Sequence, residues 1–177
     1  ALELGLEYDR LDNPLSPMKG IKATFLLKDF NKVWGGETNF RRLKFDGRWH
    51  DSFGDWRLAS RLLLERASEQ TPFYSLPAVT LRGVPAMQYL GAEVNNLEAE
   101  VGYQFDQRWS LIGFAGYGES NSQLDNLPFD LDAKIAAGGL GFRYLIAKMY
   151  GLHAGVDVAY NTQGGTALYI QVGSAWH

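Results

Sequence analysis

Apolar and polar residues alternate with a period of two along most of this chain. In the segment 2–9, leucine and tyrosine hold the even positions, while Glu3, Gly5, Glu7 and Asp9 hold the odd ones. Successive side chains of a β-strand point to opposite faces, so this pattern predicts a strand with one apolar face. Similar segments recur at 19–30, 38–50, 55–67, 95–105, 108–118, 134–147, 151–161 and 165–177. The sequence therefore predicts an all-β, antiparallel fold of about nine strands.

Such strands can form a soluble barrel with an apolar core, or a transmembrane barrel whose apolar face meets lipid. Strand length favours the second, because eight of the nine segments span 11–14 residues. Globular strands usually have about 5–6 residues, whereas a tilted membrane crossing needs about 9–11. A mean hydropathy of −0.21 fits either class, since alternation hides the apolar face from an average.

Loop lengths and aromatic residues also favour a membrane barrel. The connections tend to alternate between short and long, as outer-membrane barrels alternate short periplasmic turns with longer external loops. Under that rule aromatic residues gather at both strand ends, like two interfacial girdles. The expected periplasmic group is Tyr8, Trp49, Trp56, Tyr103, Trp109, Tyr150 and Trp176, and the external group is Tyr117 and Tyr160. We expect a protein of the bacterial outer membrane with the lipid bilayer as its partner.

The odd number of strands has a consequence for closure. Bacterial single-chain barrels have an even number of strands with both termini periplasmic, and an open edge in lipid leaves backbone groups unpaired. We therefore expect residues 1–177 to be a single barrel domain or the C-terminal portion of a larger barrel. Further strands, a homo-oligomer or a hetero-oligomer would complete it.

One long segment, 69–93, interrupts the alternation. It carries Pro72, Pro77 and Pro85 together with three aromatic residues and one arginine. Long loops without repeats in compact proteins are usually functional or disordered. The segment is either a surface loop or a loop folded into the lumen of the barrel.

Several short motifs, taken in order, resemble one family of outer-membrane barrels. Leu81-Arg82-Gly83-Val84 is followed by Phe114-Ala115-Gly116-Tyr117-Gly118, then by Gly139-Leu140-Gly141-Phe142-Arg143-Tyr144 and finally by Ala175-Trp176-His177. The set is similar to the BamA/TamA-like surface-antigen superfamily, whose lumen-inserted loop carries Val-Arg-Gly and an aromatic residue. The likeness runs over about residues 2–177 and corresponds to the last nine strands of a sixteen-stranded barrel, without the periplasmic POTRA domains.

The resemblance implies that the loop 69–93 enters the lumen, with Arg82 and Gly83 as its anchor. It implies a strand motif at Phe114, Gly118, Gly139 and Gly141, and a C-terminal strand, read by the barrel-assembly machinery, with Leu168, Ile170, Val172 and Trp176. Two positions depart from the family: Val84 replaces the aromatic residue, and Gly116 stands where the family often has an acid. Glu98, Glu100 or Asp157 is then the expected partner of the arginine.

The inward charged residues admit more than one interpretation. Arg82 is either the anchor just described or an exposed loop arginine, and the resemblance favours the anchor. Arg143, with the three candidate acids Glu98, Glu100 and Asp157, is expected to face the lumen. Together they form either a selective pore lining or an ion-pair network that fills the barrel, and we favour the network.

No catalytic motif stands out. His153 and Asp157 share one strand face, but four residues at 3.3 Å each place them about 13 Å apart, too far for a catalytic pair. There are no cysteines, the three histidines are scattered, and the net charge is −3. We expect no enzyme activity, cofactor, metal or nucleic-acid partner. The expected function is a protein translocation or insertion barrel, or the barrel module of a secretion protein. Alternatives are a passive porin-like channel and a structural subunit completed by other chains.

Overall fold

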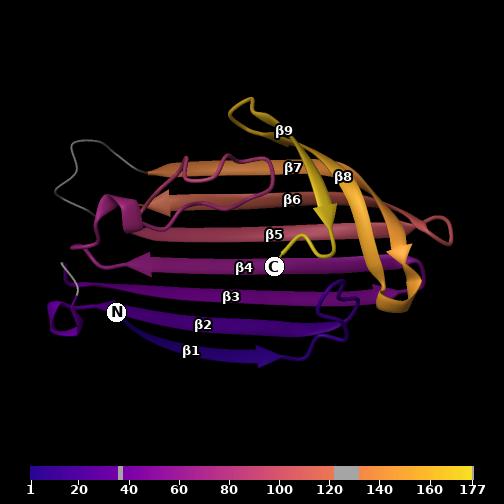
Figure 1. Cartoon of the computed structure of the whole chain (residues 1–177). Helices are drawn as coiled ribbons and strands as arrows, with labels where there is room; N and C mark the ends of the chain where they lie inside the picture. The colour runs from indigo at the N-terminus through magenta and orange to yellow at the C-terminus, as the bar shows by residue number, and fades with distance from the viewer. Residues whose placement is uncertain (36–37, 122–131, 177) are drawn as a thin grey trace.

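The structure is a computed structural model that describes residues 1–35, 38–121 and 132–176. These residues form one antiparallel sheet of nine strands, each hydrogen-bonded to its neighbours in sequence (Figure 1). The all-β class, the strand count and the antiparallel order are thus confirmed. The strands are β1 (Leu2–Asp9), β2 (Gly20–Phe30), β3 (Phe40–Phe53), β4 (Trp56–Ala67), β5 (Glu93–Gln104), β6 (Trp109–Asn121), β7 (Ala133–Ala147), β8 (Leu152–Asn161) and β9 (Thr166–Val172).

Helical structure is confined to three short 3-10 segments: η1 (Lys32–Trp34), η2 (Phe73–Ser75) and η3 (Lys148–Tyr150). Within the described residues, no helix has the length and apolar character to cross a membrane.

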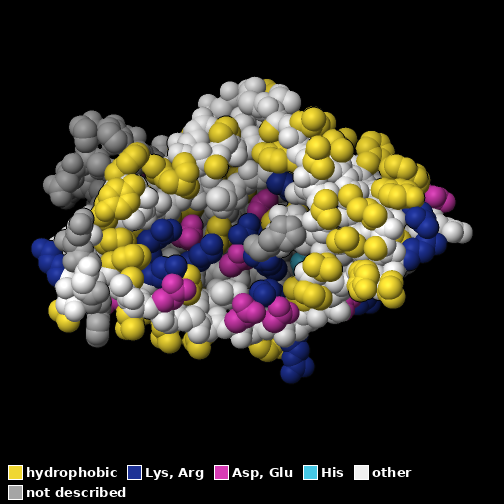
Figure 2. All heavy atoms as spheres, viewed as in Figure 1, with side chains coloured by type: hydrophobic (Ala, Val, Ile, Leu, Met, Phe, Trp, Pro, Cys, Tyr) yellow, Lys and Arg dark blue, Asp and Glu magenta, His cyan; other side chains and the backbone are white. Residues whose placement is uncertain are grey.

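Most large apolar side chains of the sheet face outside, and most of its buried charged side chains face inside. Its outer face exposes large apolar residues, such as Ile170 at 82% and Leu168 at 68%. Its inner face buries charged and polar residues, including Asp157 at 0% and Asn96 at 2%. Figure 2 shows acidic and basic side chains gathered in the hollow of this inner face, with apolar side chains around it.

The connection between β4 and β5 lies on the inner face of the sheet. Val79, Leu81 and Val84 from this loop pack in one buried cluster with Val94 of β5 and with Ile135 and Ala137 of β7. A bridge between Ala78 and Leu90 brings the two arms of the loop together. The main apolar cluster of the molecule is therefore loop against sheet, at the end of the strands where the long loop emerges. We call this the loop end and the opposite one the turn end.

Three strand ends lie three or more residues from those predicted, and the first is that of β6, which continues to Asn121. β3 continues to Phe53, so that only Gly54 and Asp55 connect it to β4. The final strand is shorter than the predicted 165–177, because β9 stops at Val172. Gly173 then adopts a φ of 81°, a left-handed conformation suited to glycine, and donates its N–H to the carbonyl of His153 at 2.7 Å. This turn directs residues 173–176, the tail, toward the inner face.

The sheet remains open along its two edges. β1 pairs with β2 alone and β9 pairs with β8 alone among the described strands. At the turn end the two sides are bridged without β-pairing: Ser174 N–H donates to Leu15 O at 2.8 Å, and Asn13 Nδ2 donates to Tyr150 O at 2.7 Å. Within the described residues, the strands therefore form an open sheet and not a closed barrel.

Candidate functional site

We call the connection between β4 and β5, residues 68–92, the inner loop. Arg82, near its tip, is buried between this loop and the sheet. Its Nη1 lies 2.7 Å from Glu100 Oε2 on β5 and 3.5 Å from Asp157 Oδ2 on β8, and the side chain is 7% exposed. Its guanidinium carbon lies 3.8 Å from the centroid of the Phe114 ring on β6, a cation–π distance. One loop residue therefore contacts three strands, and two of the three candidate acids, Glu100 and Asp157, are its partners.

Arg143 on β7 binds the same aspartate. Its two Nη groups donate to the two carboxylate oxygens of Asp157, the second of them at 2.8 Å. Nη2 also donates to Gln171 on β9 at 2.7 Å. Two-point binding of a carboxylate suits the planar guanidinium. Asp157 is fully buried and accepts from two arginines, which is how its charge is tolerated away from water. We call Arg82, Glu100, Phe114, Arg143 and Asp157 the arginine cluster.

Gly83 fixes the loop through its backbone. Its N–H donates to the hydroxyl of Tyr169 at 2.9 Å, and its carbonyl accepts from Asn161 Nδ2 at 2.6 Å. Its φ of 95° requires glycine, and a Cβ here would lie 3.0 Å from Ala159 Cβ. Sequence reasoning did not select Tyr169 or Asn161. The available signal was their inward position on strands predicted to end near the loop.

Glycines on the inner face make room for these contacts. Gly141 lies beneath the Asp157 carboxylate, and a Cβ on Gly139 would come within 2.6 Å of the Phe114 ring. A Cβ on Gly116 would lie 3.0 Å from Leu81. The departure at position 116 therefore has a steric reason, since a longer side chain there would collide with the loop.

Gly118→Ala is expected to displace the inner loop. The added Cβ would lie 2.5 Å from Val79 Cγ1 and 2.7 Å from Asn96 Oδ1, both buried, and overpacking of this kind costs about 1–3 kcal/mol. The free energy of unfolding from urea titration should fall by this amount, and proteolytic cleavage within 69–92 should become faster. Gly113→Ala, on the outer face of the same strand, is the matched control because its Cβ meets only ordinary contacts at 3.6 Å. Equal effects of the two variants would contradict the packing of the loop on β6.

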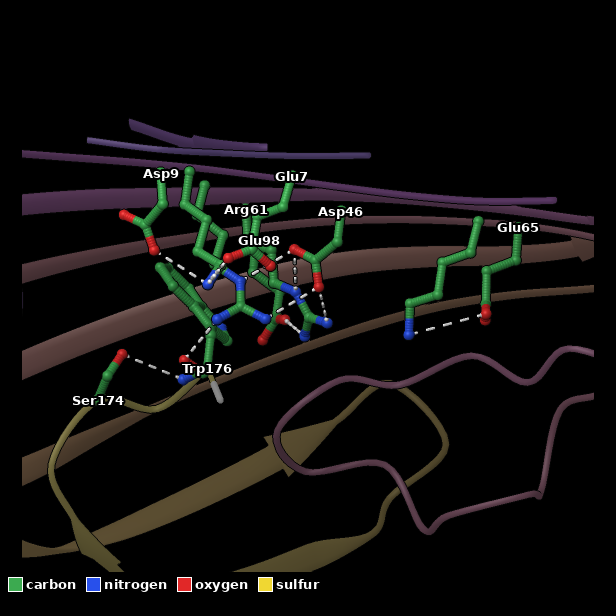
Figure 3. A network of polar contacts seen from close by, with 11 residues as sticks. Glu7, Asp9, Asp46, Arg61, Glu65, Glu98, Ser174 and Trp176 are labelled. Carbon is green, nitrogen blue, oxygen red and sulfur yellow. Dashed lines mark hydrogen bonds and ion pairs between the residues drawn. The ribbon is translucent and has the colours of Figure 1, made fainter. Parts of the chain in front are cut away.

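A second group of charges lies on the inner face, and Figure 3 shows Asp46, Arg61 and Glu98 of this group close together. Asp46 on β3 accepts from Arg48 at 3.0 Å and from Arg61 of β4 at 2.8 Å. Arg61 also lies 3.5 Å from Glu98, so the ion pair of this third candidate acid is with Arg61. The formal charges of these two arginines and two acids cancel.

The predicted placement of Trp176 was wrong. We expected it on the outer face with Leu168, Ile170 and Val172, which are indeed exposed there. Trp176 is instead 6% exposed, and its carbonyl accepts from Arg48 Nη1 at 2.8 Å. Its ring centroid lies 5.8 Å from that of His50. The cause is the turn at Gly173, because the strand stops at Val172, five residues before the predicted end at 177. His177 lies outside the described residues.

The chemistry of this region is that of a fixed network. Its arginines and carboxylates contact one another across five strands and the loop, so each ionic group is stabilised by a partner of opposite charge. Among the described residues, no group of three or more His, Cys, Asp or Glu side chains is placed to hold a metal ion. The arrangement can hold the inner loop in one position on the sheet.

The chain was also compared with known proteins. A scan against protein-family models matched none of them, and a search of curated proteins found no similar sequence.

Proposed function

We propose that this chain forms the wall of a β-barrel in a bacterial outer membrane, with its outer face against lipid and its inner face toward the interior. The observation that carries the proposal is the burial pattern. Asp157 and Arg143 are buried on one side of the sheet, while Leu140, Leu168 and Ile170 are exposed by 64%, 68% and 82% on the other.

Energetics support lipid as the environment of the outer face. Leaving a large aliphatic side chain in water instead of burying it forgoes about 1.5–3 kcal/mol. The exposed apolar side chains extend over the outer faces of all nine strands. A soluble barrel would turn this face inward as its core, yet here the inner loop packs against the opposite face.

Aromatic side chains at the turn end support a membrane interface there. Trp49, Trp56 and Trp109 are each 41–44% exposed, and each stands close to one of the short connections at that end. Tyr117 and Tyr160 are exposed toward the loop end. Indole and phenol rings favour the headgroup region, where the apolar body and polar tip are both satisfied.

For the activity of the barrel, we favour protein translocation or insertion, or the carriage of a secreted domain. The support is the inner loop, which polar contacts hold to β5, β8 and β9 through Arg82 and Gly83. In this mechanism the wall is a rigid scaffold, the loop shapes its interior, and β9 is the strand that the barrel-assembly machinery reads. A passive channel is the second candidate, because the inner face is lined by charges of both signs.

Refolding into lipid vesicles tests the two activities side by side. If the barrel serves insertion, vesicles that contain the chain should accelerate the folding of a second, urea-unfolded outer-membrane barrel added from outside. Vesicles with an unrelated barrel of similar size are the control. An unchanged folding rate together with faster efflux of a small sugar would reject insertion and favour the passive channel.

A further inference from the structure

The free edge of β1 is the least covered part of the sheet. Each of its residues, from Leu2 to Asp9, is exposed, and its one described partner strand is β2. In Figure 1, β1 lies at the margin of the sheet with no described strand beyond it. An exposed edge of this kind is a template for pairing with another strand.

The hydrogen-bonding pattern shows which backbone groups that edge offers. Arg10 N–H donates to Ile21 O at 2.9 Å, just beyond the β1–β2 ladder, and the same register pairs Tyr8 with Ala23 and Leu2 with Asp29. In an antiparallel ladder, alternate residues bond to one neighbour and the residues between them point the other way. The N–H and C=O groups of Glu3, Gly5 and Glu7 therefore point to the open edge.

The side chains of the same three residues define the chemistry of a partner. Glu3 lies 3.0 Å from Lys28, and Lys22 lies 3.1 Å from Glu7 and 3.0 Å from Asp9. Two lysines thus form ion pairs with three carboxylates. Gly5, between Glu3 and Glu7, leaves room for long side chains from a neighbouring strand, and a Cβ there would meet only Leu26 at 3.6 Å.

We propose that β1 is an interaction surface for an added antiparallel strand that carries lysine or arginine at two inner positions four residues apart, opposite Glu3 and Glu7. Apolar residues at its alternate positions would continue the outer face formed by Leu2, Leu4 and Leu6. The inference rests on the proposed membrane location, because in lipid the unpaired groups of Glu3, Gly5 and Glu7 need hydrogen-bond partners.

Strand direction restricts the partner further. Nine strands in antiparallel order make β1 and β9 run the same way, from the loop end to the turn end. Antiparallel pairing at both edges then requires an odd number of added strands, the first and last of which run from the turn end to the loop end. In a second copy with the same membrane orientation, both edge strands, β1 and β9, would run parallel to β1. A second copy is therefore disfavoured as the antiparallel partner.

A pair of labelled peptides tests the edge directly. One is a ten-residue strand with valine or leucine at alternate positions and lysine at the two positions opposite Glu3 and Glu7; the other has glutamate at those two positions. With the refolded chain in detergent micelles, we expect the lysine peptide to bind about tenfold more tightly, the size expected for two cross-strand charge pairs. Glu3→Lys with Glu7→Lys should reverse that preference.

A backbone variant separates strand pairing from simple charge attraction. Gly5→Pro removes an N–H that points to the free edge and leaves the bonds to β2 in place, as proline on an edge strand allows. It should weaken the binding of both peptides. Equal binding of the two peptides by the unaltered chain would overturn the proposal, and so would an unchanged preference in the lysine variant. Specific cross-linking of Glu7→Cys between two copies would assign the edge to a second copy and would also overturn it.

The inference and the proposed membrane location fail in different ways. A chain that floats with vesicles but shows no peptide preference loses only the inference about β1. A chain that remains in the aqueous phase loses the proposed membrane location.

Discussion

Arg82→Ala is expected to lower the free energy of unfolding by about 3 kcal/mol, the cost of removing one partner from a buried ion pair. The truncation removes the contact with Glu100 at 2.7 Å and the stacking on Phe114 at 3.8 Å. Asp157 keeps Arg143, so Glu100 is the carboxylate that loses its ion pair. The inner loop should detach and the refolded protein should lose its heat-modifiable mobility on gels.

Two variants make this result specific. Arg41→Ala removes an ion pair of similar length, Arg41 Nε to Asp29 Oδ1 at 3.0 Å, but Arg41 is 71% exposed, so a change of at most about 1 kcal/mol is expected. Glu100→Gln added to Arg82→Ala should recover part of the lost stability, because it removes the carboxylate charge that has lost its ion pair with Arg82. Unchanged mobility and unfolding midpoint in Arg82→Ala would show that the arginine does not anchor the loop.

Ile170→Arg is expected to block insertion into vesicles. Ile170 lies within β9 on the outer face and is 82% exposed, so the proposed membrane location puts it in the hydrocarbon of the bilayer. An arginine on the lipid face at the midplane of a barrel costs about 2–4 kcal/mol. The fraction of protein that co-floats with vesicles after refolding should fall accordingly.

The same substitution separates lipid from water as the surroundings of the outer face. At so exposed a site in a soluble protein, a change to arginine is usually within about 0.5 kcal/mol of neutral. Gln163→Arg, in the exposed turn that precedes β9, controls for the added charge and should insert normally. Normal insertion of Ile170→Arg would reverse the assignment of the two faces.

Much of the sheet was predictable because the alternation of apolar and polar residues along a strand is a local pattern in the sequence. The even positions of 2–9 and the run Leu168, Ile170, Val172 point outward as their period demands. Inward placement of Arg143 and Asp157 follows from the same period, since both lie between apolar neighbours on their strands. Turn residues located the connections to within a few positions.

The remainder depends on interactions between distant parts of the chain. A choice among Glu98, Glu100 and Asp157 as partners of Arg82 requires the depth at which the loop enters, and no local pattern contains that depth. Likewise, Gly116 and Gly118 are explained by the volume of Leu81 and Val79 above them. Trp176 continues the alternation in the sequence, but the left-handed turn at Gly173 ends the strand before it.

Fluorescence quenching by brominated lipids tests the central claim that the outer face meets the bilayer. Two single-tryptophan variants, one retaining Trp109 and one retaining Trp176, would be refolded into vesicles of brominated phosphatidylcholine. Trp109 is 43% exposed on the outer face, whereas Trp176 is 6% exposed on the inner face. We expect strong quenching of Trp109 and little of Trp176. Equal quenching of the two, or an unquenched Trp109, would contradict it.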